Sequence, residues 1–200
     1  MDKDRNYFNF LIDFLNNFVY NKHKGDIMKL NYYKLHDEVK DPQFATDGSA
    51  CFDICAYLDN PVTVYSMNNH KEKRSPETVQ WSDIEELQIS IAPADRVLIP
   101  TGLVFDIPEG YSIRIHPRSS ISLKKGLALT NGEGIIDSDY YHETFIMFTN
   151  TSADEVRIKH GERIAQGELV KTETYTIEET FTIPTQTTQR VGGFGSTGTE

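Results

Sequence analysis

Arg118, Ser119 and Ser120 follow an alternating apolar run and carry groups that can bind an anion. Pro117 ends that run, so a short helix is predicted to start here, with Ser119 or Ser120 as its cap and Gly126 at its end. A helix start offers free backbone N–H groups, and an arginine with two hydroxyls beside them can bind a phosphate group. The same residues also fit a capped surface helix with a solvated arginine. The tripeptide alone leaves both interpretations open.

Residues 131–140, NGEGIIDSDY, place two glycines and an acid around an apolar pair. The glycines predict a tight hairpin whose backbone N–H and C=O groups can read the edge of a planar ring. Asp137 follows the apolar pair, where partial desolvation would favour the role of general base. An ordinary Asp-Ser-Asp turn is the alternative. Asp53 is a second acid in an apolar run, where a buried charge needs a partner, a metal or a strand end.

Residues 190–200, RVGGFGSTGTE, combine four glycines with an arginine and an aromatic ring. Glycine at this density opposes a fixed helix or strand. Arg190 suits an anion and Phe194 suits a flat ring. The segment is therefore either a disordered end, as is common at termini, or an arm that becomes ordered over a ligand.

The elements that must position these residues are short alternating runs separated by turn residues, from Leu30 onward. Many short strands at regular spacing predict an all-β barrel or jelly roll. An insertion at about residues 66–90 contains two credible helix starts, at 75–77 and 82–85, so we expect one short helix there. Strands are expected at 97–99, 103–105, 111–115, 145–148, 156–158 and 174–176.

The first 28 residues predict a helical extension. Six apolar residues recur at helical spacing between Asp4, a potential cap, and Gly25, a potential stop. Acidic and asparagine residues interrupt this pattern, which excludes a signal peptide, and the segment is too short and polar to span a bilayer. We expect the helix to pack on a β domain at 29–187, which a Gly-rich arm at 188–200 follows. The apolar residues are Phe8, Leu11, Ile12, Leu15, Phe18 and Val19.

Length and charge limit the classes of partner. Two hundred residues suffice for one ordinary domain with additions. The formal net charge of −10 argues against stable nucleic acid binding, which needs a basic surface. Cys51 and Cys55 are the only cysteines, and without nearby histidines they lack the ligands of a structural zinc site. Free thiols fit a reducing compartment, so we expect a cytoplasmic protein without membrane contact.

Five ordered blocks resemble the trimeric dUTP diphosphatases, the dUTPases. Several motifs in the right order are a stronger signal than any one of them. A sixth run, residues 99–103, IPTGL, is also similar, and the resemblance covers roughly residues 30–198. The blocks are 48–54 (GSACFDI), 117–120 (PRSS), 131–140 (NGEGIIDSDY), 161–166 (GERIAQ) and 192–198 (GGFGSTG).

The resemblance implies a β jelly roll that forms a homotrimer with shared active sites. It also implies an activity, the hydrolysis of dUTP to dUMP and pyrophosphate by Mg²⁺-assisted attack of water on the α-phosphate. That reaction limits uracil incorporation into DNA and supplies dUMP for thymidylate synthesis. The net charge and the lack of a dense carboxylate cluster agree with a cation that substrate phosphates mainly hold.

Most site residues of the family have counterparts here. Arg118, Ser119 and Ser120 match the residues that bind the phosphates. Asn131 and the backbone through Gly134, Ile135 and Ile136 match the uracil reader. Tyr140 matches the ring that packs on the deoxyribose, and Asp137 matches the carboxylate that deprotonates the attacking water.

Other matches concern the metal and the arm. Asp53 and Gln166 match polar residues near the phosphates, with Asp53 reaching Mg²⁺ through water. In the arm, Arg190 matches the γ-phosphate ligand and Phe194 the ring over uracil, followed by Gly195 and Ser196. Arg190 stands only four residues before Phe194, one fewer than in many members. His142 stands where the family usually has glycine.

Two rival functions remain. A dCTP deaminase shares the fold and the Arg-Ser-Ser block, but it needs a catalytic glutamate and a different turn at 137–140. A non-catalytic regulator that binds a nucleotide or a protein is expected to lack Asp137 or the arm, and both are present. A protein partner remains an option for residues 1–28 or 66–90.

Overall fold

Two five-stranded sheets form the centre of the fold in the computed structural model, which describes residues 28–81 and 83–189. The predicted N-terminal helix at 4–24 and most of the C-terminal arm lie outside these residues. The first sheet has the order β12 (Gly134–Ile136), β10 (Tyr111–Pro117), β15 (Arg163–Lys171), β3 (Phe52–Cys55), β2 (Gln43–Phe44). The second has the order β11 (Leu127–Leu129), β13 (Phe145–Asn150), β8 (Arg96–Pro100), β4 (Val62–Tyr65), β5 (Lys71–Arg74).

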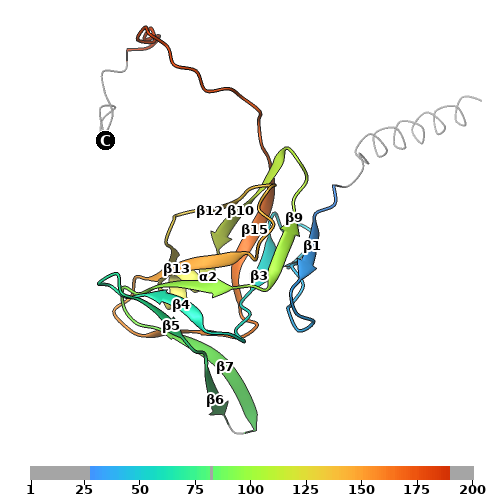
Figure 1. Cartoon of the computed structure of the whole chain (residues 1–200), viewed down its shortest axis with the longest axis vertical. Coiled ribbons are helices and arrows are strands. Elements are labelled where there is room, and N and C mark those ends of the chain that lie inside the picture. Colours follow the sequence, from blue (N-terminus) through green and yellow to red (C-terminus); the bar gives the residue numbers. More distant parts are fainter. Residues whose placement is uncertain (1–27, 82, 190–200) are drawn as a thin grey trace, which may run out of the picture.

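Smaller elements complete the all-β jelly roll, which confirms the predicted fold class (Figure 1). β1 (Asn31–Lys34) pairs with β9 (Leu103–Asp106), and β14 (Val156–Lys159), β7 (Ile84–Ile91) and β6 (Glu77–Trp81) form a three-stranded sheet. The helix α2 (Ser119–Lys125) follows β10 directly. Within the described residues, no helix has the length and apolarity that crossing a bilayer would require.

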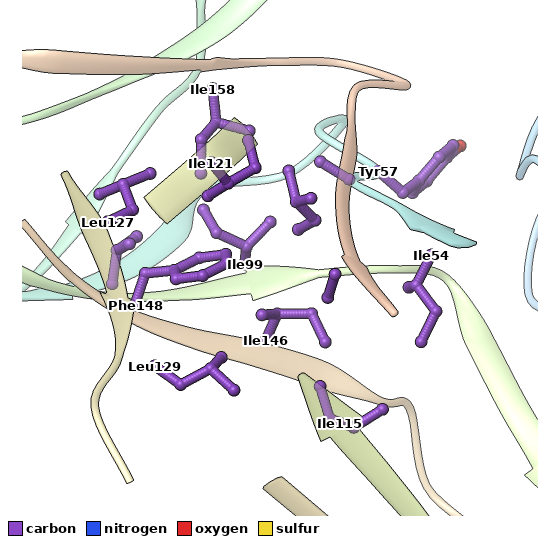
Figure 2. Packing of buried hydrophobic residues seen from close by; sticks show 14 of the residues in the cluster. Ile54, Tyr57, Ile99, Ile115, Ile121, Leu127, Leu129, Ile146, Phe148 and Ile158 are labelled. Carbon is purple, nitrogen blue, oxygen red and sulfur yellow. The ribbon is translucent and has the colours of Figure 1, made fainter. Parts of the chain in front are cut away.

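The core forms because apolar residues alternate along the strands and face the space between the two sheets. Ile54 and Ile115 of the first sheet and Ile146 and Phe148 of β13 are all nearly fully buried (Figure 2). Burying each such side chain stabilises the fold by about 1.5–3 kcal/mol. This core anchors β3 and β15, which carry Asp53 and Gln166, and β10, which leads into Arg118.

The insertion is built from strands, so the prediction of a short helix there is wrong. β5 pairs with β4, and β6 and β7 form a hairpin that projects from the two large sheets (Figure 1). Thr78 and Val79 are β-branched, and Ile89 and Ile91 alternate into the core, so strand pairing outweighs the capping signals. Arg74 secures the insertion, since its Nη1 donates to the carbonyl oxygen of Ser90 at 2.8 Å.

One predicted strand, at 174–176, is not formed. β15 ends at Lys171, and residues 172–189 leave the sheets without a strand partner (Figure 1). Tyr175 is 76% exposed and Phe181 is 92% exposed. The alternating pattern is present, but a strand also needs a hydrogen-bonding neighbour, and the described residues offer none here. The other five predicted strands fall within β8, β9, β10, β13 and β14.

Candidate active site

Arg118 stands at the junction of β10 and α2. Its backbone is extended, with φ −72° and ψ 141°, and its carbonyl oxygen accepts the first hydrogen bonds of the helix. Ser119 and Ser120 therefore lie inside the first turn, and neither acts as the predicted cap. Within the described part of the chain, their hydroxyls make no hydrogen bond. Gly126 ends the helix at φ 65°, as predicted, because glycine adopts the left-handed region easily.

The Arg118 guanidinium is held by a buried acid. Its Nε lies 3.0 Å from Oδ1 of Asp53, whose carboxylate is nearly fully buried. The other oxygen, Oδ2, accepts a hydrogen bond from Nη1 of Arg163 at 2.9 Å. The buried charge at Asp53 thus has the partners that burial requires, and they are two arginines.

Gln166 lies on the same face of the sheet as Asp53. In the register of the strands it stands opposite Asp53 on β3 and opposite His116 on β10. Directly opposed residues of antiparallel strands project to the same side. The fold therefore brings Gln166 and Asp53 together with Arg118 and its two neighbouring serines at one end of the sheet.

The hairpin at 131–136 forms a second group. Gly132 has φ 74°, and its N–H donates to the carbonyl oxygen of Leu129 at 3.1 Å. Gly134 stands opposite Ile115, and a Cβ at Gly134 would come within 2.9 Å of the Cβ of Ile115. Such an approach is essentially never seen, so only glycine fits there. β12 lies at the sheet edge, which leaves outward backbone groups free for a ligand.

A pocket of about 250 Å³ opens beside this hairpin. Asn131, the three residues of β12 and Tyr140 line it, and apolar residues of β13 form the opposite wall. The Tyr140 hydroxyl donates to the carbonyl oxygen of Glu143 at 3.0 Å, and its ring meets the edge of His142 at 5.6 Å between centroids. These contacts fix the tyrosine ring at the rim of the pocket.

Asp137 follows β12 directly, in the turn that leads to Tyr140. The backbone N–H of Tyr140 donates to the carbonyl oxygen of Asp137 at 3.2 Å, which closes this turn. The Asp137 side chain is exposed, and within the described residues its carboxylate has no hydrogen bond or ion pair. The described residues therefore do not supply the desolvation that was expected for a general base at this position.

The structure brings the predicted residues together in two groups rather than one. Among the described residues, no hydrogen bond or ion pair joins the Arg118 group to the residues of the pocket. The hairpin is instead tied to β10 by Glu133, which accepts from Nη1 of Arg114 at 3.2 Å. Arg190, Phe194, Gly195 and Ser196 lie outside the described residues.

Arg163 was missed by reasoning from the sequence. The signal was present, because Arg163 belongs to the GERIAQ block and a buried acid at Asp53 called for positive partners. Its contact depends on how β15 lies against β3, and residue spacing does not reveal that arrangement.

A protein-built metal site is absent from the part of the chain that the structure describes. There, no group of three or more His, Cys, Asp or Glu residues could hold an ion. Cys51 and Cys55 are both free, and burial raises the pKa of each thiol.

Sequence comparison supports one family. A family model described as dUTPase matches residues 84–198. The deoxyuridine 5'-triphosphate nucleotidohydrolase of Brucella melitensis is 44% identical over 115 residues, which cover 58% of this chain and 73% of that protein. The enzyme of the same name from Finegoldia magna is 37% identical over 157 residues, covering 78% of this chain and 90% of that protein.

Comparison with solved structures supports the fold. The crystal structure of a dUTPase from Streptococcus mutans has a TM-score of 0.54 and 22% identity, covering 73% of this chain and 98% of that one. A mutant dUTPase of Staphylococcus bacteriophage 80alpha, solved with dUpNHpp, has a TM-score of 0.65 and 20% identity. The match covers 86% of this chain and 99% of that one. At these identities, the likeness demonstrates a shared fold.

Proposed function

Because the chain belongs to the dUTPase family, we propose that it hydrolyses dUTP to dUMP and pyrophosphate. One observation carries this proposal above the others. One wall of the pocket, formed by Asn131, β12 and Tyr140, comes from a single sequence block, and Asp137 of the same block follows β12 directly. Base recognition and water activation are therefore joined in one short segment.

We assign recognition of the uracil ring to Asn131 and the backbone of Gly134, Ile135 and Ile136. The outer edge of β12 carries free N–H and C=O groups, which can pair with the polar edge of a pyrimidine as a complementary strand would. The close approach of Gly134 to Ile115 keeps this edge in place. A slot shaped by backbone leaves no space for the methyl group of thymine.

Tyr140 selects the sugar in this proposal. Its hydroxyl is engaged by the carbonyl oxygen of Glu143, so the ring cannot swing freely away from the pocket. A ring held in that position packs on deoxyribose and excludes a 2′-hydroxyl. UTP should therefore be a poor substrate.

The phosphates are assigned to Arg118, Ser119, Ser120 and Gln166. The serine hydroxyls are free to donate within the described residues, and Gln166 faces the same side of the sheet as Asp53. From the family resemblance, we assign the γ-phosphate to Arg190 and the far face of the base to Phe194. Gly195 and Ser196 continue the arm that closes over the substrate.

Asp137 acts as the general base. Its unpaired carboxylate accepts a proton from water while the water oxygen bonds to the α-phosphorus. The bond between the α-phosphorus and the oxygen that bridges to the β-phosphorus breaks, and pyrophosphate leaves with the electron pair. A positioned general base contributes about 10²- to 10⁴-fold to the rate. A neighbouring subunit and the arm would supply the exclusion of water that the single chain lacks.

Mg²⁺ fits this site as a cation that the substrate brings. Mg²⁺ binds such substrates through phosphate oxygens and waters, so the lack of a three-residue cluster in the described chain is compatible with it. When bound, the cation neutralises charge on the phosphates. Asp53 can reach its water shell only with the lone pairs that Arg118 and Arg163 leave free.

A homotrimer with shared sites would reunite the two groups of residues. The support is twofold. The Arg118 group and the pocket have no direct polar link in one chain, and residues 172–189 carry apolar side chains that no part of the described chain covers. Ile177 and Ile183 are 90% and 95% exposed. They belong to two short runs, 174–177 and 180–183, in which apolar residues alternate with threonines as in a strand that pairs with another subunit.

The test is a nucleotide panel. Purified protein with Mg²⁺ is assayed for pyrophosphate release from dUTP, UTP, dTTP and dCTP, and the nucleotide products are identified. We expect dUMP from dUTP and much poorer turnover of the others. Ammonia release from dCTP would favour the deaminase, and absence of pyrophosphate release from dUTP would overturn the proposal. Comparable turnover of UTP would remove the role of Tyr140.

A further inference from the structure

A β-bulge in β15 determines where the Arg163 side chain points. Gln166 and Ala165 stand opposite Asp53 and Ile54 in regular register, but the register then shifts between Ala165 and Arg163. Without the shift, Arg163 would share the face of Ala165, which is fully buried in the core. The extra residue turns Arg163 to the opposite face, where it meets Asp53. Bulges commonly re-aim a side chain in this way next to functional sites.

Backbone carbonyl groups of the bulge also hold Arg118. The N–H of Arg118 donates to the carbonyl oxygen of Ile164 at 3.3 Å, and Nη1 of Arg118 donates to the carbonyl oxygen of Arg163 at 3.5 Å. The contact between Nε of Arg118 and Asp53 is the third interaction that holds Arg118 in place. Asp53 and the bulge therefore fix both the backbone and the guanidinium of Arg118.

Charge explains why two arginines share one acid. If Asp53 had only Arg118 as a partner, one carboxylate would neutralise one guanidinium, and the phosphate site would lose its net positive charge. Arg163 occupies Oδ2 of Asp53, so the three groups together keep one positive charge. Oδ2 is also no longer available to draw Arg118 into a two-point contact with the carboxylate.

We propose that Arg163 is a positioning residue for phosphate binding, which presents the guanidinium of Arg118 to the substrate by engaging the second oxygen of Asp53. This inference rests on the proposed function, because it takes the phosphates of dUTP as the ligand of Arg118. It also gives Asp53 an orienting role toward Arg118, in addition to any contact with the water shell of a cation.

The experiment compares Arg163→Gln with Arg157→Gln in the full-length protein. Arg157 is a matched control because its side chain has the same exposure, 54%, and also pairs with an acid, Glu155. Both variants remove one positive charge from the chain. Arg163 faces an open polar pocket of about 560 Å³, so glutamine can be accommodated there.

For Arg163→Gln we expect the KM for dUTP to rise about tenfold, as for a weakened charge-assisted contact, with kcat nearly unchanged. The Mg²⁺ concentration for half-maximal rate should stay the same. Arg163→Lys should recover part of the loss, because it restores the charge with a single donor group. Binding of inorganic pyrophosphate, measured by calorimetry, should weaken by a similar factor. Arg157→Gln should match the wild type in every measurement.

Equal KM values for the two glutamine variants would overturn the proposal. A higher Mg²⁺ requirement in Asp53→Asn, without any change in Arg163→Gln, would assign Asp53 to the cation and would also overturn it. If Arg163→Gln fails to assemble, the test uses Arg163→Lys instead. A wild-type KM and wild-type pyrophosphate binding in Arg163→Lys would then count against the proposal. Failure of the wild type to hydrolyse dUTP would count against the proposed function, while pyrophosphate binding still tests the role of Arg163.

Discussion

Gly134→Ala should damage the base pocket by forcing β12 away from β10. The added Cβ would lie 2.9 Å from the Cβ and 3.4 Å from the Cγ1 of Ile115. Ile115 is buried in the core, and its Cβ cannot be moved by choosing another rotamer. The strand must therefore shift by several tenths of an ångström. Overpacking of this kind costs about 1–3 kcal/mol.

The same shift should weaken substrate binding. The proposed backbone hydrogen bonds from β12 to the base would depend on the position of this edge, and each would contribute about 0.5–1.5 kcal/mol. A combined loss of about 2 kcal/mol corresponds to about a thirtyfold fall in kcat/KM for dUTP. For a domain of this size, the stability loss should lower Tm by about 2–10 °C.

Steady-state pyrophosphate release and a thermal melt measure the two effects. Gly48→Ala is the matched control, because nothing lies within 4 Å of the Cβ it would add and its φ is outside the left-handed region. We expect the control to stay within about 0.5 kcal/mol of the wild type. Wild-type kcat/KM and Tm in Gly134→Ala would refute the steric reasoning, and a lower Tm with unchanged kcat/KM would refute the role of β12 in binding.

Three further predictions concern the base, the arm and a buried thiol. Asp137→Asn should abolish turnover while a non-hydrolysable dUTP analogue still binds, and retained turnover would contradict the general-base role. Deleting residues 188–200 should cripple catalysis but leave the proposed trimer assembled, so a monomer on size-exclusion chromatography would contradict an arm that serves catalysis and not assembly. Because burial raises the pKa of the Cys55 thiol, Cys55 in the folded protein should react more slowly with a thiol reagent at pH 8 than after unfolding. The folded state then retains this proton at a higher pH than the unfolded state does, so the thiol should lower stability as pH rises above about 9. Thermal melts of the wild type and Cys55→Ser at pH 8 and pH 10 test whether the thiol lowers stability at the higher pH.

The fold class and five of the six predicted strands are confirmed, because alternation reports which side chains are buried. Val97 and Ile99 on β8 are buried with more exposed neighbours, as the pattern indicates. The insertion was predicted wrongly, because Ser75 and Pro76 carry local helix-start signals while the pairing of β7 with β14 is a long-range contact. The local sequence around a helix start carries no information about the long-range strand pairing that competes with helix formation.

Some groupings of the candidate residues could be predicted, but their detailed contacts could not. Asn131 and Tyr140 do line one pocket, and Gln166 does lie beside Asp53. The bulge that turns Arg163 could not be predicted, because a one-residue change of register leaves no trace in the residue types along β15. The partners of Asp53 followed from that change of register.

The segment from Tyr175 to Ile183 shows why a correct strand pattern can fail to give a strand. Its apolar residues alternate with threonines on both sides of Glu178 and Glu179, yet the chain leaves the sheets at Lys171. Alternation specifies which face of a strand is apolar, whereas the hydrogen-bonding neighbour must come from elsewhere. When that neighbour belongs to another subunit, strand formation becomes a property of the assembly. The exposed segment and the two separate groups of site residues have one common explanation, because one trimer would both pair the strand and bring Arg118 to the pocket.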